Sequence, residues 1–588
     1  MKSFFKTFFA SFLGSAVLLL VVVIFIFGSL IASIASSSEA NVTLKPKTVL
    51  YMNLNYDIPE RTNSNSLEMY FNVDKIDMAG MNDILNNIDA AAIDPNIEGI
   101  FLDLSTIGTS SANIEEIRNR LISFKESGKF IISYGEAYTQ SAYYLASVSD
   151  KIYMLPDGVL DIHGMATQGM FYKHLLEKLD IEMQIIRPAN NKFKSAVEPY
   201  FLDEMSEANR EQTSVYLNSM WNTICNDISA SRNIKVETIN KLADDMTLMF
   251  DTKAAVDNGF IDELIYKDEL LAKLHELTNT PDNKKLNIIK NTQYAKVRPE
   301  LMTGEDNIAI VYASGQIIDG EGDDTTIGST TLSAAIRKAR TDKKVKAIVM
   351  RVNSPGGSAV ASEVIRREVE LAAKEKPVIV SMGSYAASGG YWISSTADYI
   401  FADPNTLTGS IGVFGTIPNL KGFLNDKIGL TFDEVKTNKN SDFGSLSKPL
   451  TPYQMTMMQK HVTETYDNFI TLVSETRGLR KTFVDSIGQG RVWSGTDALG
   501  IGLVDELGGI DKAIAYAADK AGLSSYSIKE FPKQEDPLEN LFKTETQEYY
   551  TKAVMKKNLG SKYQYLEAIE NISKIEGIQA LMPMVVVE

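Results

Sequence analysis

The 588-residue sequence contains a single cysteine, Cys225, and only four histidines. One cysteine excludes an internal disulfide and CxxC redox chemistry, and it argues against a thiolate metal site. No cluster of His, Cys or carboxylate residues has the spacing of a metal or cofactor motif, so we expect the protein to need neither. Basic residues are outnumbered, 59 against 75 acidic ones, and the net charge is −16. Without a basic stripe, nucleic-acid binding is not expected.

Charged residues are also missing from residues 7–38, a run of 32 positions near the N-terminus. This run exceeds the roughly 20 residues that a helix needs to cross a bilayer, whereas the apolar core of a cleaved signal peptide has about 7–15. Lys2 and Lys6 precede the run, so the positive-inside rule keeps the N-terminus in the cytoplasm and exports the rest of the chain. We therefore expect residues 1–40 to form a membrane anchor, with cleavage near residues 35–40 as the alternative.

An internal repeat is the most informative feature that the sequence does contain. Residues 99–156 align without a gap on residues 347–404 at a constant offset of 248, and residues 193–199 align on 443–449 at an offset of 250. A chain of this length is too long for one core, so the repeat predicts two domains of roughly 250 residues each. The matched pairs include Glu115 and Glu363, Arg118 and Arg366, Gly135 and Gly383, Tyr143 and Tyr391, Asp150 and Asp398, Phe193 and Phe443, and Pro199 and Pro449.

Short apolar runs alternate with helical patterns in both copies. Strands are expected at residues 49–54 and 308–312, followed by buried strands at 99–104 and 347–352. Apolar runs of this length are typical of parallel sheets, and the alternation predicts an α/β fold of βαβ units with right-handed crossovers. The expected parts are the anchor (1–40), a first domain (41–278), a polar linker (279–306), a second domain (307–525) and a C-terminal tail for docking or oligomer contact (526–588).

The two copies differ at a turn that can carry chemistry. The second copy presents Ser388 in the turn at residues 386–390, where the first copy has Gln140. We expect this turn to join a strand to a helix N-terminus, which would expose the Ser388 Oγ and leave the amide of Gly389 free to donate. A small residue in a tight turn is the plain alternative, because the sequence is not the GxSxG of a nucleophile elbow.

A second glycine-rich turn, residues 353–358, follows a buried strand. Its Pro-Gly-Gly sequence can direct backbone N–H groups into a site, and we predict that the amides of Gly357 and Gly389 form an oxyanion hole. One such donor typically lowers a reaction barrier by about 3–4 kcal/mol. The first copy has Thr-Ile-Gly-Thr at residues 106–109 instead, so the glycine pair is missing where the serine is missing. That coincidence favours a functional turn.

A general base must accompany the serine, and none of the four histidines lies in a matching motif. His163 is the nearest of them. Lys194 is the better candidate, because its neighbours are apolar and the second copy has Gly444 at its position. A lysine can act as a base only if burial lowers its pKa from about 10.4 to roughly 7–8, and an interface between two domains can provide such a dry site. Lys192 and Lys448 are the competing lysines. A serine in one half and a lysine in the other predict one active site assembled from two domains.

Four motifs in a fixed order carry a family resemblance. They are Lys-Ser-Ala-Val-Glu-Pro at 194–199, Asn-Ser-Pro-Gly-Gly at 353–357, Ala-Ala-Ser-Gly-Gly-Tyr-Trp-Ile at 386–393 and Gly-Ser-Ile-Gly-Val-Phe-Gly at 409–415. Together they resemble the signal peptide peptidase A family, in its long, two-domain bacterial form, which has the fold of Clp protease and the crotonase superfamily. The resemblance runs from the N-terminal segment to about residue 525 and continues more loosely through the tail.

The resemblance implies a Ser/Lys dyad and a place of action. Ser388 would be the nucleophile, Lys194 the general base, and Ser410 a hydroxyl that orients the lysine. It implies a serine endopeptidase anchored in the bacterial inner membrane, with periplasmic catalytic domains, that degrades cleaved signal peptides and other extended apolar peptides. It further implies a bowl-like homo-oligomer, expected to be a homotetramer.

Two other classes of function remain open at this stage. Crotonase relatives use a similar oxyanion hole for acyl-CoA chemistry, but an exported and anchored protein would not meet CoA. A non-catalytic membrane scaffold could retain the fold for binding alone. A scaffold has no reason to keep a buried lysine opposite a nucleophilic serine, so we predict the peptidase.

Overall fold

The computed structural model describes most of the chain between residues 43 and 534 and a short C-terminal segment. The described ranges are 43–62, 78–323, 325–534 and 578–583, together with residues 13–14, 17–18, 21–22 and 555. Nearly all of the predicted anchor and most of the predicted tail therefore lie outside the described residues. Within the described ranges, no helix is both long enough and apolar enough to span a membrane.

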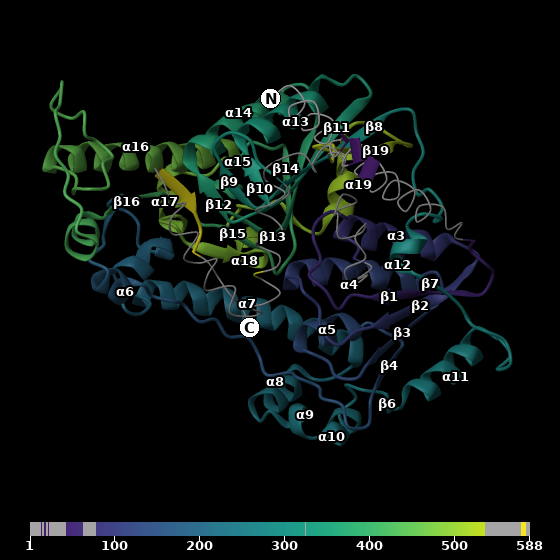
Figure 1. Ribbon diagram of the computed structural model, residues 1–588. Coiled ribbons are helices and arrows are strands. Elements are labelled where there is room, and N and C mark those ends of the chain that lie inside the picture. Colours follow the sequence, from purple (N-terminus) through teal and green to yellow (C-terminus); the bar gives the residue numbers. More distant parts are fainter. Residues whose placement is uncertain are drawn as a thin grey trace, which may run out of the picture.

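The first half of the chain forms a six-stranded parallel sheet, with strand order β6-β4-β3-β2-β1-β7 (Figure 1). Helices cover both faces of this sheet, and the central strand β2 is therefore buried along nearly its whole length. The strands are β1 (Thr48–Asn53), β2 (Ile97–Asp103), β3 (Phe130–Gly135), β4 (Lys151–Met154), β6 (Glu263–Leu264) and β7 (Asn287–Lys290).

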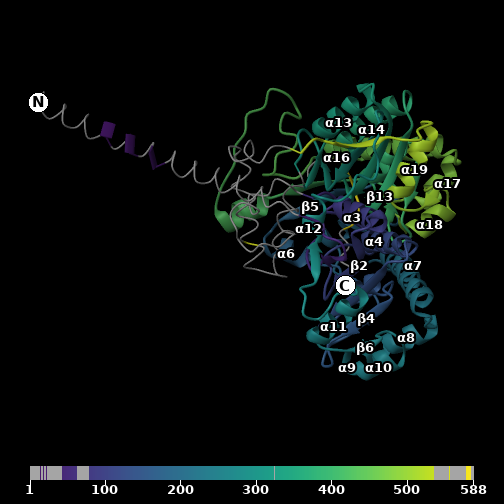
Figure 2. The ribbon, with the colours of Figure 1, turned by 90° about the vertical axis from the view of Figure 1, so that its right-hand side faces the viewer.

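The helices of the first half are α3 (Met81–Ile93), α4 (Ser111–Lys125), α5 (Gln140–Ala146), α6 (Lys173–Lys178), the 3₁₀ helix η1 (Ser195–Tyr200), α7 (Glu207–Arg232), α8 (Val236–Asp244), α9 (Thr247–Phe250), α10 (Thr252–Asp257), α11 (Lys267–Leu277) and α12 (Asn291–Tyr294). α3, α4 and α5 pack on one face of the sheet, and α11 packs on the other. α8 to α11 lie at the end of this half that is farthest from the second half (Figure 1, Figure 2).

The second half repeats this topology strand for strand. Its central strands lie in the order β18-β14-β13-β11-β8-β19, all parallel, and β15 and β17 extend the sheet beside β13. The strands are β8 (Asn307–Ser314), β11 (Val345–Ser354), β13 (Val378–Ala387), β14 (Tyr399–Ala402), β15 (Leu407–Gly409), β17 (Val492–Ser494), β18 (Glu506–Leu507) and β19 (Ser527–Phe531). The helices are α13 (Ser329–Thr341), α14 (Ala359–Ala373), α15 (Gly389–Ser394), the π-helix η2 (Phe423–Ile428), α16 (Pro452–Arg477), α17 (Lys481–Ile487), α18 (Gly495–Gly500) and α19 (Ile510–Lys520).

Individual contacts are duplicated along with the strand order. In the first half Arg232 ends the 26-residue helix α7 and pairs with Asp262 at 2.9 Å. In the second half Arg477 ends the 26-residue helix α16 and pairs with Asp505 at 2.6 Å. In each half, this ion pair joins the long helix to the aspartate directly before a short strand, β6 in the first half and β18 in the second. The expected α/β fold and its internal repeat are therefore confirmed.

Two strands of the sheets lie outside the domain ranges expected from the sequence. β7 lies inside the segment expected to be a linker, residues 279–306, and pairs in parallel with β1. β19 lies beyond residue 525, in the predicted tail, and pairs in parallel with β8. Both are edge strands with mostly exposed or half-exposed residues, among them Lys290 and Lys529. An edge strand lacks the continuous apolar run of a buried parallel strand, so the sequence pattern does not reveal it.

A third sheet contains strands from both halves and from the C-terminal segment. Its order is β10-β9-β12-β20-β16-β5. β5 belongs to the first half by sequence, yet it pairs antiparallel with β16 of the second half. This pairing carries the chain across the boundary between the halves shortly before Lys194. The strands are β5 (Glu182–Ile186), β9 (Gln316–Ile318), β10 (Thr326–Gly328), β12 (Gly356–Ser358), β16 (Phe414–Asn419) and β20 (Ile578–Leu581).

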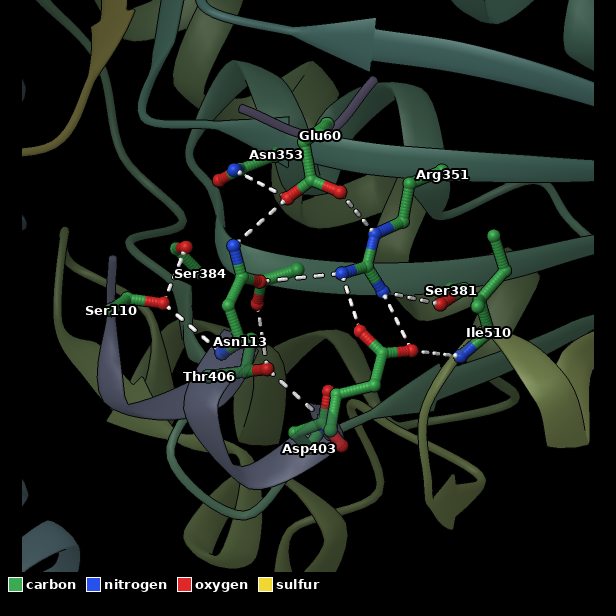
Figure 3. Close-up of polar contacts among 12 residues, drawn as sticks. Glu60, Ser110, Asn113, Arg351, Asn353, Ser381, Ser384, Asp403, Thr406 and Ile510 are labelled. Atoms are coloured by element: carbon green, nitrogen blue, oxygen red, sulfur yellow. Dashed lines mark hydrogen bonds and ion pairs between the residues drawn. The ribbon is translucent and has the colours of Figure 1, made fainter. Parts of the chain in front are cut away.

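A buried arginine joins the two halves at a second place (Figure 3). Arg351 on β11 is 1% exposed, and it contacts Glu60 at 2.8 Å and Glu116 at 2.7 Å, both from the first half. It also donates to Ser381 Oγ at 3.0 Å, and Glu116 accepts from the backbone of Ile510 at 2.5 Å. Burial alone would lower the pKa of Arg351, but the two glutamates raise it above its ordinary value. The cation therefore stays charged and links the halves.

Two further acids are buried at the same interface. Glu115 on α4 accepts hydrogen bonds from the backbone and side-chain nitrogens of Asn405, at 3.3 and 2.8 Å. Burial raises the pKa of Glu115 to about 8 and raises the pKa of Asp403 well above its ordinary value. Burial thus favours the protonated form of both carboxyls over the charged form beside Arg351.

We expect Arg351→Met to lower the free energy of unfolding by about 3–5 kcal/mol, because two buried carboxylates lose their cation. Urea denaturation of the full chain measures this change. Arg367→Met is the matched control, because Arg367 is 54% exposed and pairs with Glu370 at the surface. Loss of such a surface pair costs at most about 1 kcal/mol. Equal destabilisation by the two substitutions would contradict the role given to Arg351.

Candidate active site

Ser388 stands between the end of β13 and the start of α15. Its backbone has φ 57° and ψ −111°, a conformation that non-glycine residues rarely adopt and that costs of order 1–3 kcal/mol. The turn is held because the Ser388 amide donates to Gly409 O at 2.8 Å and its carbonyl accepts from the Trp392 amide at 2.8 Å. The strand-to-helix turn is as expected. The expected exposure of Oγ is wrong, because Ser388 is fully buried beneath the segment that carries Lys194.

Lys194 reaches this serine from the first half of the chain. Its Nζ lies within hydrogen-bonding distance of three oxygens: Ser388 Oγ at 2.8 Å, Ser410 Oγ at 3.1 Å and the Ser410 carbonyl oxygen at 3.2 Å. Ser388 Oγ in turn donates to Gly412 O at 3.3 Å. The structure therefore brings together the three side chains that the sequence singled out. Lys194 is 194 positions from Ser388 and 216 positions from Ser410 in the sequence.

Two glycines make room for the lysine stem. Gly490 has φ +84°, and a Cβ at that position would lie 2.5 Å from the Cβ of Lys194. A Cβ on Gly412 would lie 3.3 Å from the Lys194 Cδ. A larger residue at either position would press on the aliphatic chain of Lys194. Gly412 belongs to the motif at residues 409–415, whereas Gly490 lies in no motif that the sequence reveals.

The segment around Lys194 is tied to the second half by backbone and amide contacts. The Phe193 amide donates to Gln489 O at 3.0 Å. Gln212 on α7 donates to Phe193 O at 3.0 Å and accepts from the Val492 amide at 3.1 Å. The Gln212 side chain is buried and bridges the two halves beside the site. Sequence reasoning missed it, because a single glutamine within a helix has no pattern to mark it.

The environment of Lys194 favours the neutral amine. Lys194 is 1% exposed, and no carboxylate in the described ranges forms an ion pair with it. Burial lowers its pKa well below the ordinary value for lysine. A neutral amine within 2.8 Å of a hydroxyl can accept the proton of that hydroxyl.

The two predicted glycine turns lie side by side next to Ser388. Gly356 has φ +99°, and a Cβ there would lie 2.7 Å from the Gly389 nitrogen. Gly357 follows with φ +155°, and a Cβ there would lie 2.0 Å from Ile317 O. Only glycine fits this close approach of the two backbones. The geometry is compatible with the predicted pair of oxyanion donors, Gly357 and Gly389.

The competing candidates lie elsewhere. His163 is exposed, with Nδ1 2.5 Å from Asp161. Lys192 is exposed and pairs with Glu211 at 3.3 Å, and Lys448 pairs at the surface with Asp442 at 2.5 Å. Gln140, the counterpart of Ser388, accepts from the Gly164 amide at 3.0 Å and donates to its carbonyl at 2.9 Å. Its side chain thus supports a loop in the first copy.

Metal and thiol chemistry find no structural support in the part of the chain that the structure describes. No group of three or more His, Cys, Asp or Glu side chains there is arranged to hold a metal ion. Cys225 is buried, and burial raises the pKa of its thiol to about 12. A thiol with such a pKa is not a nucleophile at neutral pH.

Two solved structures match parts of the chain at low sequence identity. A mutant of ClpP1 from Listeria monocytogenes matches 34% of this chain and 91% of its own, with 16% identity and a TM-score of 0.23. A mutant of the 1510-N membrane-bound stomatin-specific protease matches 40% of this chain and 100% of its own, with 15% identity and a TM-score of 0.26.

The curated relatives cover most of the chain. Protease 4 of Salmonella typhi is 41% identical over 475 residues, which are 79% of this chain and 75% of that protein. Protease 4 of Haemophilus influenzae is 40% identical over 446 residues, 74% of this chain and 71% of that protein. The chloroplastic serine protease SPPA of Arabidopsis thaliana is 33% identical over 445 residues, 74% of this chain and 65% of that protein. The sequence model of Peptidase family S49 matches residues 123–280 and 370–524, one segment in each half. By this match and these relatives, the chain belongs to peptidase family S49 and is a serine protease.

Proposed function

We propose that the protein is an endopeptidase with a Ser/Lys dyad, in which Ser388 is the nucleophile and Lys194 the general base. The observation that carries this proposal is the 2.8 Å contact between Lys194 Nζ and Ser388 Oγ in a buried site. Ser410 orients the amine, because its hydroxyl and carbonyl oxygens lie 3.1 and 3.2 Å from Nζ. When the neutral amine donates its two hydrogens to these two Ser410 oxygens, the lone pair of Nζ faces Ser388 Oγ.

The first half-reaction forms an acyl-enzyme. Ser388 Oγ attacks the carbonyl carbon of the peptide bond while Lys194 Nζ takes its proton. The carbonyl oxygen becomes an oxyanion, which the amides of Gly357 and Gly389 stabilise. Lys194 then gives its proton to the amine nitrogen, the C–N bond breaks and the amine product leaves. The remaining acyl group is an ester of Ser388.

The second half-reaction returns the enzyme to its starting state. Water adds to the ester carbonyl while Lys194 Nζ takes one of its protons. The ester bond then breaks, and Ser388 Oγ regains a proton from Lys194. The carboxylic acid product leaves. No metal or cofactor takes part in this sequence.

The proposed substrates are extended apolar peptides, above all signal peptides left in the membrane after preprotein cleavage. An apolar cluster that includes Tyr216, Met220, Leu407 and Val492 lies around Ala387, the residue before the nucleophile, which supports apolar substrates. The uncharged run at residues 7–38 supports an anchor in the bacterial inner membrane, with the catalytic domains on its periplasmic side.

A homotetramer is proposed on the basis of an exposed apolar segment. Between β16 and α16 the chain presents several large apolar side chains to solvent, and a monomer rarely exposes so many in one segment. Contact with further copies of the chain would cover them. They are Ile428, Leu430, Phe432, Val435, Phe443 and Leu446.

We expect Ser388→Ala and Lys194→Ala each to lower kcat/KM for an apolar peptide by about 10³-fold or more, because each removes one partner of the proton transfer. Cleavage of a fluorogenic apolar peptide by the purified full chain measures this loss. Lys192→Ala is the matched control and retains wild-type activity, because Lys192 lies at the surface beside Glu211. Full activity of a folded Lys194→Ala variant would place the base elsewhere.

We also expect the buried lysine to make stability depend on pH. The pKa of Lys194 is lowered in the folded state, so below the ordinary lysine pKa the unfolded chain binds the extra proton. Stability therefore falls as the pH falls through the window between the ordinary pKa and the lowered one. Relative to wild type, Lys194→Met gains stability across this window on going to lower pH. Urea denaturation at several pH values tests this.

Lys192→Met is the control for that series, because Lys192 is 58% exposed on its side chain. Its stability relative to wild type should not change across the same window. A Lys194→Met difference that is equally independent of pH would show that the amine remains charged in the folded protein, and would contradict its role as a base.

A further inference from the structure

Lys194 stands at the centre of a tight turn of the backbone. Its angles, φ −76° and ψ 77°, are close to those of an inverse γ-turn, in which the carbonyl of the first residue accepts from the amide of the third. Here the Ser195 amide donates to Phe193 O at 2.8 Å. A γ-turn has only this one internal hydrogen bond, so contacts from outside the turn must fix the direction in which the lysine side chain leaves it.

Gln212 on α7 supplies such contacts. Its Nε2 donates to Phe193 O at 3.0 Å and to Ser195 Oγ at 3.0 Å, so one amide group binds the residues on both sides of Lys194. Its Oε1 accepts from the amide of Val492, on β17 of the second half, at 3.1 Å. The glutamine is 1% exposed, and polar groups at such a depth depend on their hydrogen-bond partners. Gln212 therefore joins the lysine turn directly to the second half.

The orientation of the Gln212 amide is fixed by polar contacts at the start of α7. Asn209 Oδ1 accepts from Gln212 Nε2 at 3.3 Å, and Asn209 Nδ2 donates to Glu198 at 2.9 Å. Glu198 also accepts from the hydroxyl of Ser206, the N-cap of α7, at 2.6 Å. A glutamine suits this place because it has a donor and an acceptor in one side chain, whereas an ionised glutamate and a methionine have no donor.

The stretch of the second half that binds Gln212 also fixes Ser410. The Ser410 amide donates to the carbonyl oxygen of Arg491, the residue before Val492, at 2.7 Å. The Arg491 guanidinium lies over the ring of Phe193, 4.6 Å from its centre. A shift of the lysine turn relative to this stretch would therefore change the distances from the amine to Ser410 and to the nucleophile together.

The internal repeat provides an independent observation on this glutamine. α7 and α16 both have 26 residues and end in the matched residues Arg232 and Arg477, which are 245 positions apart and place Gln212 opposite Met457. Met457 is 43% exposed. The second copy has Gly444 in place of the lysine, so it has no lysine turn to hold. The glutamine is missing where the lysine is missing, which favours a role in the site.

We propose that Gln212 is a positioning residue for the general base, which holds the Lys194 turn against the second half and so keeps Nζ within reach of Ser388 Oγ. Gln212 acts through the lysine alone. This inference rests on the proposed Ser/Lys dyad and adds to it the residue that maintains the distance over which the proton moves. A misplacement of roughly 1 Å in such a pair can lower a rate by about 10²-fold.

The substitution Gln212→Met in the full chain tests this proposal. Methionine is similar in length and has no donor, so the turn loses its outside contacts. We expect kcat for the apolar peptide to fall about 10²-fold. KM should stay unchanged, because the lost interaction matters only in the transition state. An unchanged kcat in Gln212→Met would overturn the proposal.

Gln454→Met is the matched control. Gln454 is also a buried glutamine near the start of a long helix, 5% exposed, and its side chain accepts from the Thr451 amide at 2.8 Å in the cap of α16. Its loss should lower the urea midpoint of unfolding and leave kcat at the wild-type value. An equal fall of kcat in the two variants would show a general effect of losing a buried amide and would contradict the positioning role.

A double-mutant cycle with Lys194→Ala shows whether the glutamine acts through the lysine. In the Lys194→Ala background, Gln212→Met should not lower the residual activity further, because the side chain that it positions is gone. An equal loss in both backgrounds would overturn the proposal. The cycle also separates the two hypotheses. Full activity of Lys194→Ala overturns the dyad, whereas an inactive Lys194→Ala beside a fully active Gln212→Met overturns the positioning role alone.

The amine itself gives a readout that does not depend on catalysis. ¹³C NMR of protein labelled at the lysine ε-carbon follows the titration of Lys194. In Gln212→Met a displaced turn lets water reach the amine, so its midpoint should lie closer to the ordinary value of about 10.4 than in wild type. Gln212→Asn, with an amide one methylene shorter, should cause the same shift and replaces the methionine variant if that variant does not fold. A wild-type midpoint in a folded Gln212 variant would overturn the proposal.

Discussion

The contact between the Lys194 amine and the Ser388 hydroxyl is the constraint on which the rest of the structure depends. A lysine without a carboxylate partner is costly to bury, and the fold offsets that cost by keeping the amine neutral. Gly490 and Gly412 leave space for its stem, and Ser410 accepts its hydrogen bonds. The same burial that disfavours the charged amine makes it a base for the serine.

Because the two partners come from opposite halves, the site exists only while the halves keep their relative position. β5 of the first half pairs with β16 of the second half. Gln212 forms hydrogen bonds with Phe193, next to the lysine, and with Val492 of the second half. Arg351 of the second half forms ion pairs with two glutamates of the first half. The internal repeat accounts for this arrangement. Each copy has the same strand order, but the first copy has Gln140 in place of the serine and the second copy has Gly444 in place of the lysine.

Much of this arrangement could be predicted from the sequence, because repeat and motif are local signals. The central parallel strands, Ser388 and Lys194 follow from apolar runs and from differences between the copies. The edge strands β7 and β19 could not be predicted, since half-exposed strands lack a continuous apolar run. Gln212, Gly490 and the pairing of β20 depend on residues that meet only after folding. A four-residue strand with partners far away in sequence has no local pattern to identify it.

The most direct test of the dyad is the charge of Lys194 itself. ¹³C NMR of protein labelled at the lysine ε-carbon follows the titration of each amine, and the signal of Lys194 is assigned by its loss in Lys194→Arg. If the buried amine is the general base, its midpoint lies well below the ordinary lysine value of about 10.4. A midpoint at or above that value would mean that the amine is charged at neutral pH and cannot accept the Ser388 proton, which would contradict the mechanism.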